Sequence, residues 1–343
     1  MIRTDQRKNV VIWLTFVFTL IFLIIIVGGV TRLTHSGLSI VEWKPFSGVI
    51  PPLNEEKWND YFEKYKQFPE YKIMNRHMDL NDFKFIFFWE YFHRMLGRLI
   101  GLGYLLPFLY FYFQRYFDKK TSIKLFTGFL LICLQGLIGW LMVKSGLVND
   151  PRVSHYRLAL HLSTAFGIAG FILWNILEIS YNPRKNSGLH RRFKQSLLVT
   201  GGICLQIIYG AFTAGKKAGF GYNTFPKMDD AWLPDAVFSL QPAWLNFLET
   251  NAAIQFTHRI IAWCLILAIP VFLWSIRNEL NRIQKNATVM LLIMLCIQFF
   301  LGIMTILYIG SSEVLLPSIH QAGAFILFSF SIFLNYTLYR DAL

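Results

Sequence analysis

The stretch FFWEYFHRMLGR, residues 87–98, stands where a long apolar segment of the chain begins. It places a carboxylate (Glu90), a histidine (His93) and two arginines (Arg94 and Arg98) within about three helical turns. Ionisable groups are costly inside a membrane and usually mark a functional site there. This stretch therefore predicts a functional site at the start of a membrane-spanning helix.

The rest of the chain has the composition of a membrane protein. Its 343 residues are 55% hydrophobic and 15% charged, and uncharged stretches of span length recur along it. They predict an all-α polytopic fold with eight transmembrane helices, at residues 10–30, 85–113, 125–143, 156–177, 195–214, 251–276, 287–309 and 318–339. The net charge of +13 is attributed to loops on one side of the membrane, so we expect no nucleic-acid partner.

The distribution of Lys and Arg predicts the orientation. Basic residues concentrate before the first predicted span and after the second, fourth and sixth. By the positive-inside rule, both termini are cytoplasmic. The first apolar run is too long for a cleaved signal peptide, and we expect a multi-pass protein of the bacterial inner membrane. Two long loops, at residues 31–84 and 215–250, then lie outside.

An internal repeat divides the chain. VGGVTRLTHSG (27–37) aligns with YGAFTAGKKAG (209–219), and FHRMLGR (92–98) with THRIIAW (257–263). CLQGLIGW (133–140) aligns with CIQFFLGI (296–303), and LHLSTAF (160–166) with IHQAGAF (319–325). Because the order is the same in both halves, we predict two repeated four-helix bundles, residues 1–190 with the outer loop 31–84, and residues 191–343.

Four histidines occur once on each even-numbered span: His93, His161, His258 and His320. Each is 17–22 residues from a charged residue at the cytoplasmic end, which is about 25–33 Å of helix and puts all four near the outer edge of the membrane. A small residue follows each histidine by four positions, leaving a gap on that face. We predict two bis-histidine haem sites, His93 with His161 and His258 with His320, the four histidines being the iron ligands. A zinc or di-copper site and simple helix-packing hydrogen bonds remain alternatives.

Glu90 lies on the same helix face as His93, and so beside the edge of a bound porphyrin. The second half places Ala253 at the comparable position, so the carboxylate occurs in one half only. An ion pair between Glu90 and Arg94 is the alternative to a catalytic role. Arginines at the outer edge are expected to pair with haem propionates: Arg94, Arg98 and Arg259.

Six segments give the chain a resemblance to a known family: GGVTRLTHSGLSIVEWKPFSGVIPPL (28–53), EYFHRMLGR (90–98), QGLIGWLMVKSGL (135–147), LALHLSTA (158–165), THR (257–259) and IHQAGA (319–324). The whole chain resembles the haem A synthase family, in the branch shared by alphaproteobacteria and mitochondria. The resemblance implies a membrane oxidoreductase that converts haem O to haem A, oxidising the C8 methyl group to a formyl group through successive hydroxylations.

The resemblance also implies roles for the site residues. His93 and His161 would hold the substrate haem (haem O, then haem A) in the N-terminal half, with Glu90 as the carboxylate required for activity. His258 and His320 would hold haem b in the C-terminal half. Handover of haem O from a haem O synthase is implied too, while the electron partner and homo-oligomerisation stay open.

The chain departs from some family members, because it has no cysteine pair between residues 31 and 84. VEWKPFSG (41–48) is expected to be a lid over the haem edge or, alternatively, an interfacial segment. The main rival function is a non-catalytic bis-histidine b-type cytochrome that transfers electrons. It is disfavoured because all four histidines are expected on one side of the membrane. A transporter is disfavoured because transporter sites usually lie near the membrane midplane.

Overall fold

The computed structural model describes residues 4–42, 47–147, 153–181 and 191–340, and this part of the chain is helical. Eight of the described helices are long and apolar enough to cross a membrane. They are α1 (Thr4–Leu33), α4 (Leu80–Phe113), α5 (Lys119–Gly146), α6 (His155–Tyr181), α7 (Arg191–Gly215), α9 (Asn251–Ile276), α10 (Arg282–Leu307) and α11 (Leu315–Arg340). The prediction of an all-α, eight-span membrane protein is confirmed.

The helices extend beyond the predicted apolar windows, because polar capping residues begin them. Asp79 accepts hydrogen bonds from the backbone N–H groups of Asn81 and Asp82 and starts α4 five residues before the predicted span. Asp118 caps α5 in the same way. Such caps satisfy backbone donors that would otherwise have no partner, so a helix can continue into its polar flank.

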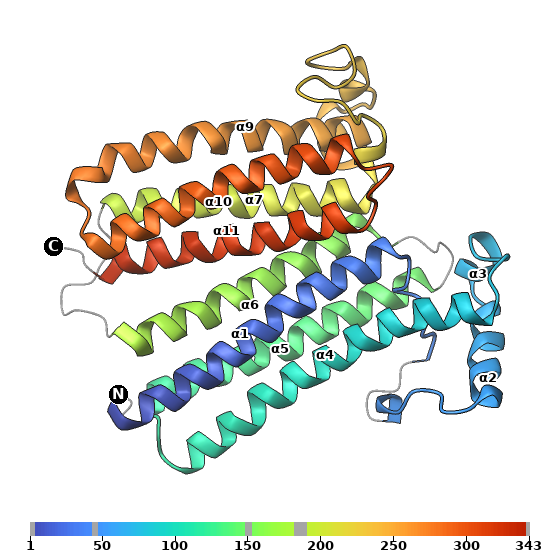
Figure 1. Cartoon of the computed structure of the whole chain (residues 1–343), viewed down its shortest axis with the longest axis horizontal. Coiled ribbons are helices and arrows are strands. Elements are labelled where there is room, and N and C mark those ends of the chain that lie inside the picture. Colours follow the sequence, from blue (N-terminus) through green and yellow to red (C-terminus); the bar gives the residue numbers. More distant parts are fainter. Residues whose placement is uncertain (1–3, 43–46, 148–152, 182–190, 341–343) are drawn as a thin grey trace.

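The spanning helices form two sets of four (Figure 1). In the first set α1 packs against α4 and α6, and α5 packs against α4 and α6. In the second set α7 packs against α9 and α11, and α10 packs against α11 and, more loosely, α9. The two sets meet where α6 lies against α7 and α11, and α1 against α11.

The contact between the sets is aromatic in its middle and polar near one end. The ring of Phe166 lies 5.6 Å from the ring centroids of both Phe325 and Phe328. Nearer the end that carries α2, Gln321 on α11 donates from Nε2 to the backbone oxygen of Ile25 on α1 (2.6 Å). Because few polar groups are available within a membrane, such a bond fixes how the two sets sit against each other.

Both long loops lie at one end of the helices, away from the N and C termini (Figure 1). The first contains η1 (Ser47–Val49), α2 (Glu55–Lys66) and α3 (Pro69–Ile73). The second contains η2 (Ala218–Phe220), η3 (Asp235–Phe238), η4 (Ala243–Leu245) and α8 (Asn246–Glu249), while η5 (Arg277–Glu279) lies at the opposite end. Of the expected lid 41–48, residues 43–46 fall outside the described residues.

The α2–α3 unit packs on the start of α4 through aromatic rings and encloses a carboxyl group. Tyr65 donates to Glu70 Oε2 (3.0 Å), and Asn75 Nδ2 donates to the Tyr65 hydroxyl (2.7 Å). Glu70 is 4% exposed. Burial raises the pKa of Glu70 to about 8; the hydrogen bond from Tyr65 opposes this shift, and the charge of Glu90 adds to it.

This raised pKa predicts how the stability of the α2–α3 unit depends on pH. A carboxyl group whose folded pKa exceeds its unfolded value favours folding when protonated, so stability should fall as the pH rises from about 4.5 to about 8 and then level off. Each unit of the shift is worth roughly 1.4 kcal/mol. Thermal unfolding followed by tryptophan fluorescence would show this decline in the wild type and a flatter profile in Glu70→Gln. An equal decline in both proteins would contradict it.

Candidate functional site

Each of the four histidines lies against a glycine on a neighbouring helix, near the end of the bundle that carries the long loops. A Cβ atom built on the glycine would come within 2.9–3.2 Å of the imidazole Cε1 atom, closer than side chains pack. The contacts are Gly28 with His93, Gly139 with His161, Gly210 with His258, and Gly302 with His320. A glycine therefore provides the space for each imidazole.

Pairing of the histidines through a shared ligand stays a prediction. His93 and His161 lie near enough to interact electrostatically, and so do His258 and His320. The first pair joins α4 and α6 within the first helix set, and the second joins α9 and α11 within the second set. Each set thus holds one pair of imidazoles between its helices.

Three glutamines that sequence analysis missed contact these histidines. Gln135 Nε2 lies 3.1 Å from His161 Nδ1, and Gln298 Nε2 lies 3.1 Å from His320 Nδ1. Gln206 Nε2 lies 3.3 Å from His258 Nε2. Each glutamine precedes the contacting glycine by four residues, so a Gln-x-x-x-Gly pattern at 135–139, 206–210 and 298–302 was the available signal.

The site residues fit a planar ligand held between imidazoles. The Oε1 atoms of the three glutamines are buried with no hydrogen-bond partner among the described residues, as are the Nδ1 atoms of His93 and His258. Buried polar atoms are normally satisfied, so these mark sites whose polar groups await a ligand. Within the described part of the chain, no three His, Cys, Asp or Glu side chains gather as metal ligands. Paired imidazoles without further ligands suit haem, whose macrocycle supplies the remaining bonds to iron.

Glu90 is 2% exposed, and both of its carboxylate oxygens are engaged. Oε2 accepts hydrogen bonds from Ser39 Oγ and from the backbone N–H of Ile40, both at 2.7 Å. Oε1 accepts from Arg94, one helical turn further along α4. The ion pair considered from the sequence is present, together with a contact to the outer loop that the sequence did not reveal.

The counterpart of Glu90 in the second half is Gln255, which stands three residues before His258 as Glu90 does before His93. The assignment of Ala253 to this position was wrong: Ala253 is five residues before His258 and packs with Val237 of η3. Gln255 Nε2 donates to the backbone oxygen of Tyr222 in the second outer loop (2.7 Å). The prediction that a carboxylate stands at this position in the first half only is confirmed, because Gln255 is an amide.

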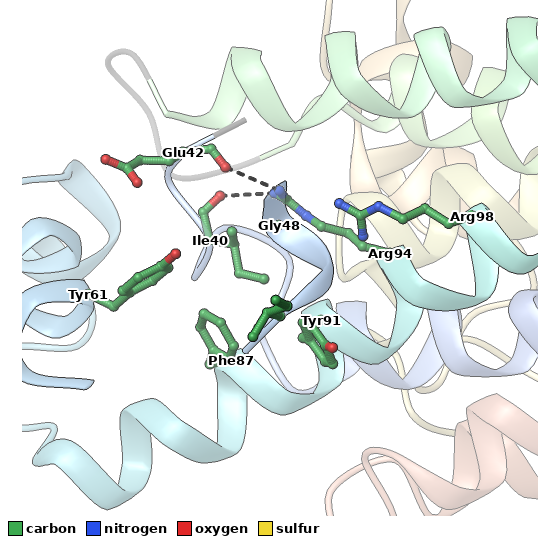
Figure 2. Close-up of a pocket in the computed structure, with 9 residues that line it drawn as sticks. Ile40, Glu42, Gly48, Tyr61, Phe87, Tyr91, Arg94 and Arg98 are labelled. Atoms are coloured by element: carbon green, nitrogen blue, oxygen red, sulfur yellow. Dashed lines mark hydrogen bonds between the residues drawn. The ribbon is translucent and has the colours of Figure 1, made fainter. Parts of the chain in front are cut away.

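Two of the three arginines assigned to propionates contact the outer loops. Arg94 donates to the backbone oxygens of Ile40 (2.9 Å) and Glu42 (3.5 Å), as Figure 2 shows. Arg259 donates to the backbone oxygens of Tyr222, Thr224 and Lys227 at 2.8–3.0 Å. Pairing of these arginines with propionates stays a prediction.

Arg98 lies with Arg94 in a small pocket between the first long loop and residues 87–98 of α4 (Figure 2). Apolar and aromatic side chains form much of its wall. The lining residues are Ile40, Glu42, Gly48, Ile50, Tyr61, Phe87, Tyr91, Arg94 and Arg98. Two guanidinium groups beside apolar walls suit the carboxylate end of an amphipathic ligand.

Comparison with known proteins identifies the family. Residues 11–332 match the family model COX15-CtaA, described as cytochrome oxidase assembly protein. The chain belongs to this family. Among its relatives, the heme A synthase of Nitrosospira multiformis is 45% identical over 99% of this chain and 97% of its own length. That of Flavobacterium psychrophilum is 43% identical over 98% of both chains. The heme A synthase COX15 of Arabidopsis thaliana is 42% identical over 98% of this chain and 76% of its own. The resemblance to the haem A synthase family is confirmed, while the branch within the family stays a prediction.

The glycine contacts yield a prediction with a control on the same helix. In Gly139→Ala the new methyl group would lie about 2.9 Å from His161 Cε1, so the imidazole must move. In Gly136→Ala the new methyl group meets nothing within 4 Å among the described residues. We expect the first variant to lose roughly half of the bound haem and the second to keep it, because one site of two is affected. Haem absorbance per chain would measure this, and equal haem content in the two variants would contradict it.

Proposed function

We propose that this chain is a haem A synthase, a membrane oxidoreductase that converts the C8 methyl group of haem O to a formyl group. The observation that carries the proposal is identity of 42–45% over 98–99% of the chain to relatives named heme A synthase. The paired imidazoles and the single buried carboxylate beside one pair support it.

The two sites receive different haems in this proposal. His93 and His161 hold the substrate, haem O and then haem A, in the half formed by residues 1–190. His258 and His320 hold haem b in the half formed by residues 191–343. The presence of Glu90 in only the first half supports this division, because a site that merely binds haem needs no carboxylate beside it. The same asymmetry favours the synthase over the b-type electron-transfer cytochrome.

The reaction removes electrons from the methyl carbon and adds oxygen in two steps. The first hydroxylation gives a hydroxymethyl group, and the second gives a geminal diol that loses water to leave the formyl group. Each hydroxylation is a two-electron oxidation of the carbon, so with water as the source of oxygen an external electron acceptor takes up four electrons and four protons are released. Haem b in the second site would supply a further redox centre.

The chain's own residues bind, orient and shield the substrate. The imidazoles of His93 on α4 and His161 on α6 would hold the macrocycle. Glu90 is held by Ser39, Ile40 and Arg94, so its negative charge is already oriented when positive charge develops at the reacting carbon. Fixed charges of this kind stabilise a transition state strongly in a site with little water. Arg98, which lines the pocket beside Arg94, is the proposed partner of a propionate.

The proposed setting is a bacterial inner membrane with both termini cytoplasmic and the haem sites near the outer face. The charge distribution of the loops supports this orientation. Haem O is very apolar, so direct handover from a membrane-bound haem O synthase is the proposed route of entry.

The catalytic role of Glu90 can be tested by Glu90→Gln in protein produced together with a haem O synthase. We expect haem to remain bound while formation of haem A falls by about 10²–10³-fold, the usual cost of removing one oriented electrostatic group. Chromatography of extracted haem measures substrate and product together. Glu178→Gln is the matched control, because Glu178 pairs with Lys124 at the opposite end of the bundle. Undiminished haem A in Glu90→Gln would contradict the role.

A further inference from the structure

The arginine that follows the first histidine of each pair contacts an outer loop. Arg94 follows His93 and donates to the backbone oxygens of Ile40 and Glu42. Arg259 follows His258 and donates to those of Tyr222, Thr224 and Lys227. The two arginines occupy matching positions in the aligned motifs FHRMLGR and THRIIAW. In both halves, one turn of helix therefore carries a histidine and a contact to the loop.

The residue three positions before His93 or His258 is hydrogen-bonded to the same loop residue that the arginine contacts. At Ile40, Glu90 accepts from the backbone N–H while Arg94 donates to the carbonyl oxygen. At Tyr222, Gln255 and Arg259 both donate to the carbonyl oxygen, at 2.7 and 2.9 Å. Hydrogen bonds with a charged partner are about twice as strong as neutral ones, so these contacts hold the loops until a charged partner is drawn to another group.

The first loop segment, residues 38–42, crosses the mouth of the first helix set. Ser39 and Ile40 are attached to α4 through Glu90. Leu38, 3% exposed, lies against α5, where its methyl groups come within 3.0 Å of a Cβ built on Gly146. The segment thus connects α4, through the neighbours Glu90 and Arg94 of His93, with α5, and we call it the first cover.

The second loop segment, residues 222–227, has the same position in the second set. Arg259 and Gln255 attach it to α9. The ring of Phe225 stacks on Trp263 of α9, with centroids 5.8 Å apart, and lies 6.3 Å from Phe299 of α10. This second cover therefore connects α9, at the neighbours Gln255 and Arg259 of His258, with α10.

We propose that Arg94 and Arg259 are positioning residues whose hydrogen bonds hold the covers over the two haem sites. We further propose that the bonds to the first cover, which Arg94 shares with Glu90, open when haem is exchanged. The proposal rests on the function proposed above. It departs from the propionate role expected from the sequence, because both guanidinium groups are directed at loop backbone.

The hydrogen bonds to the two covers differ in a way that matches the proposed roles of the two haem sites. In the first, Arg94 divides its hydrogen bonds between Glu90 and the cover, so a substrate carboxylate that draws Arg94 away, or a reacting group that engages Glu90, also loosens Ser39 and Ile40. In the second, Arg259 gives three bonds to the cover, and Gln255 is neutral. A substrate site must exchange haem O for haem A in every cycle, whereas a haem b site keeps its haem.

Hydrogen–deuterium exchange on the purified holoprotein tests these hydrogen bonds to the covers. We expect Arg94→Gln to accelerate exchange in peptides covering residues 36–42 by about tenfold and to leave residues 218–228 unchanged, since charge-assisted bonds are lost at one cover only. Arg259→Gln should do the reverse, so each variant is the control for the other. Ser39→Ala removes a bond between the first cover and Glu90 without altering an arginine, and a smaller increase at residues 36–42 is expected.

A second readout is transfer of haem to excess apomyoglobin, followed by extraction and chromatography, which separates haem A and haem O from haem b. Arg94→Gln should speed the release of haem O and haem A about tenfold with haem b unchanged, and Arg259→Gln should speed the release of haem b alone. Unchanged exchange at residues 36–42 in both Arg94→Gln and Ser39→Ala would overturn the proposal, as would equal effects of both arginine variants on both covers. If only haem b were found at both sites, the proposed function would fail, while the exchange experiment would still decide whether these hydrogen bonds hold the covers.

Discussion

The contact of each imidazole with a glycine of the neighbouring helix is the constraint on which the rest of this structure depends. An imidazole within a membrane helix can face the bundle interior only where the opposing helix gives it room. Gly28, Gly139, Gly210 and Gly302 give that room at one level of the bundle. The loops, the glutamines and the buried carboxylate are all arranged around these four contacts.

The fold could be predicted well from the sequence, because its signals are local. Apolar windows located the eight helices, and polar caps such as Asp79 explain why the helices are longer than the windows. The pairing of His93 with His161 followed from the aligned motifs, since residues at one level of one bundle must lie near each other. The glutamines were also within reach, because the pattern Gln-x-x-x-Gly recurs three times.

The loop contacts could not be predicted. Nothing in the sequence says that Arg94 points at the carbonyl of Ile40, some fifty residues earlier, because backbone oxygens are the same at every residue. The sequence indicated charges near a membrane surface, for which propionates were the obvious partners. Ala253 was misplaced opposite Glu90 for a simpler reason, since the counterpart lies three residues before the histidine, at Gln255.

The two halves share a framework but differ where exchange and chemistry are expected. Glu90 and Gln255 occupy equivalent positions, yet one brings a charge and the other an amide. The residue four positions before the contacting glycine also differs, because it is Ile24 for His93 and a glutamine for the other three histidines.

The most direct test of the central claim, one substrate haem and one haem b in two separate sites, is to identify the haems bound by the intact protein. The protein would be produced together with a haem O synthase, and its haem measured by pyridine haemochrome spectra and by chromatography after extraction. This account predicts haem A or haem O together with haem b, in about equal amounts. Haem b alone, with haem O available, would contradict it and would leave Glu90 as an ion-pair partner of Arg94.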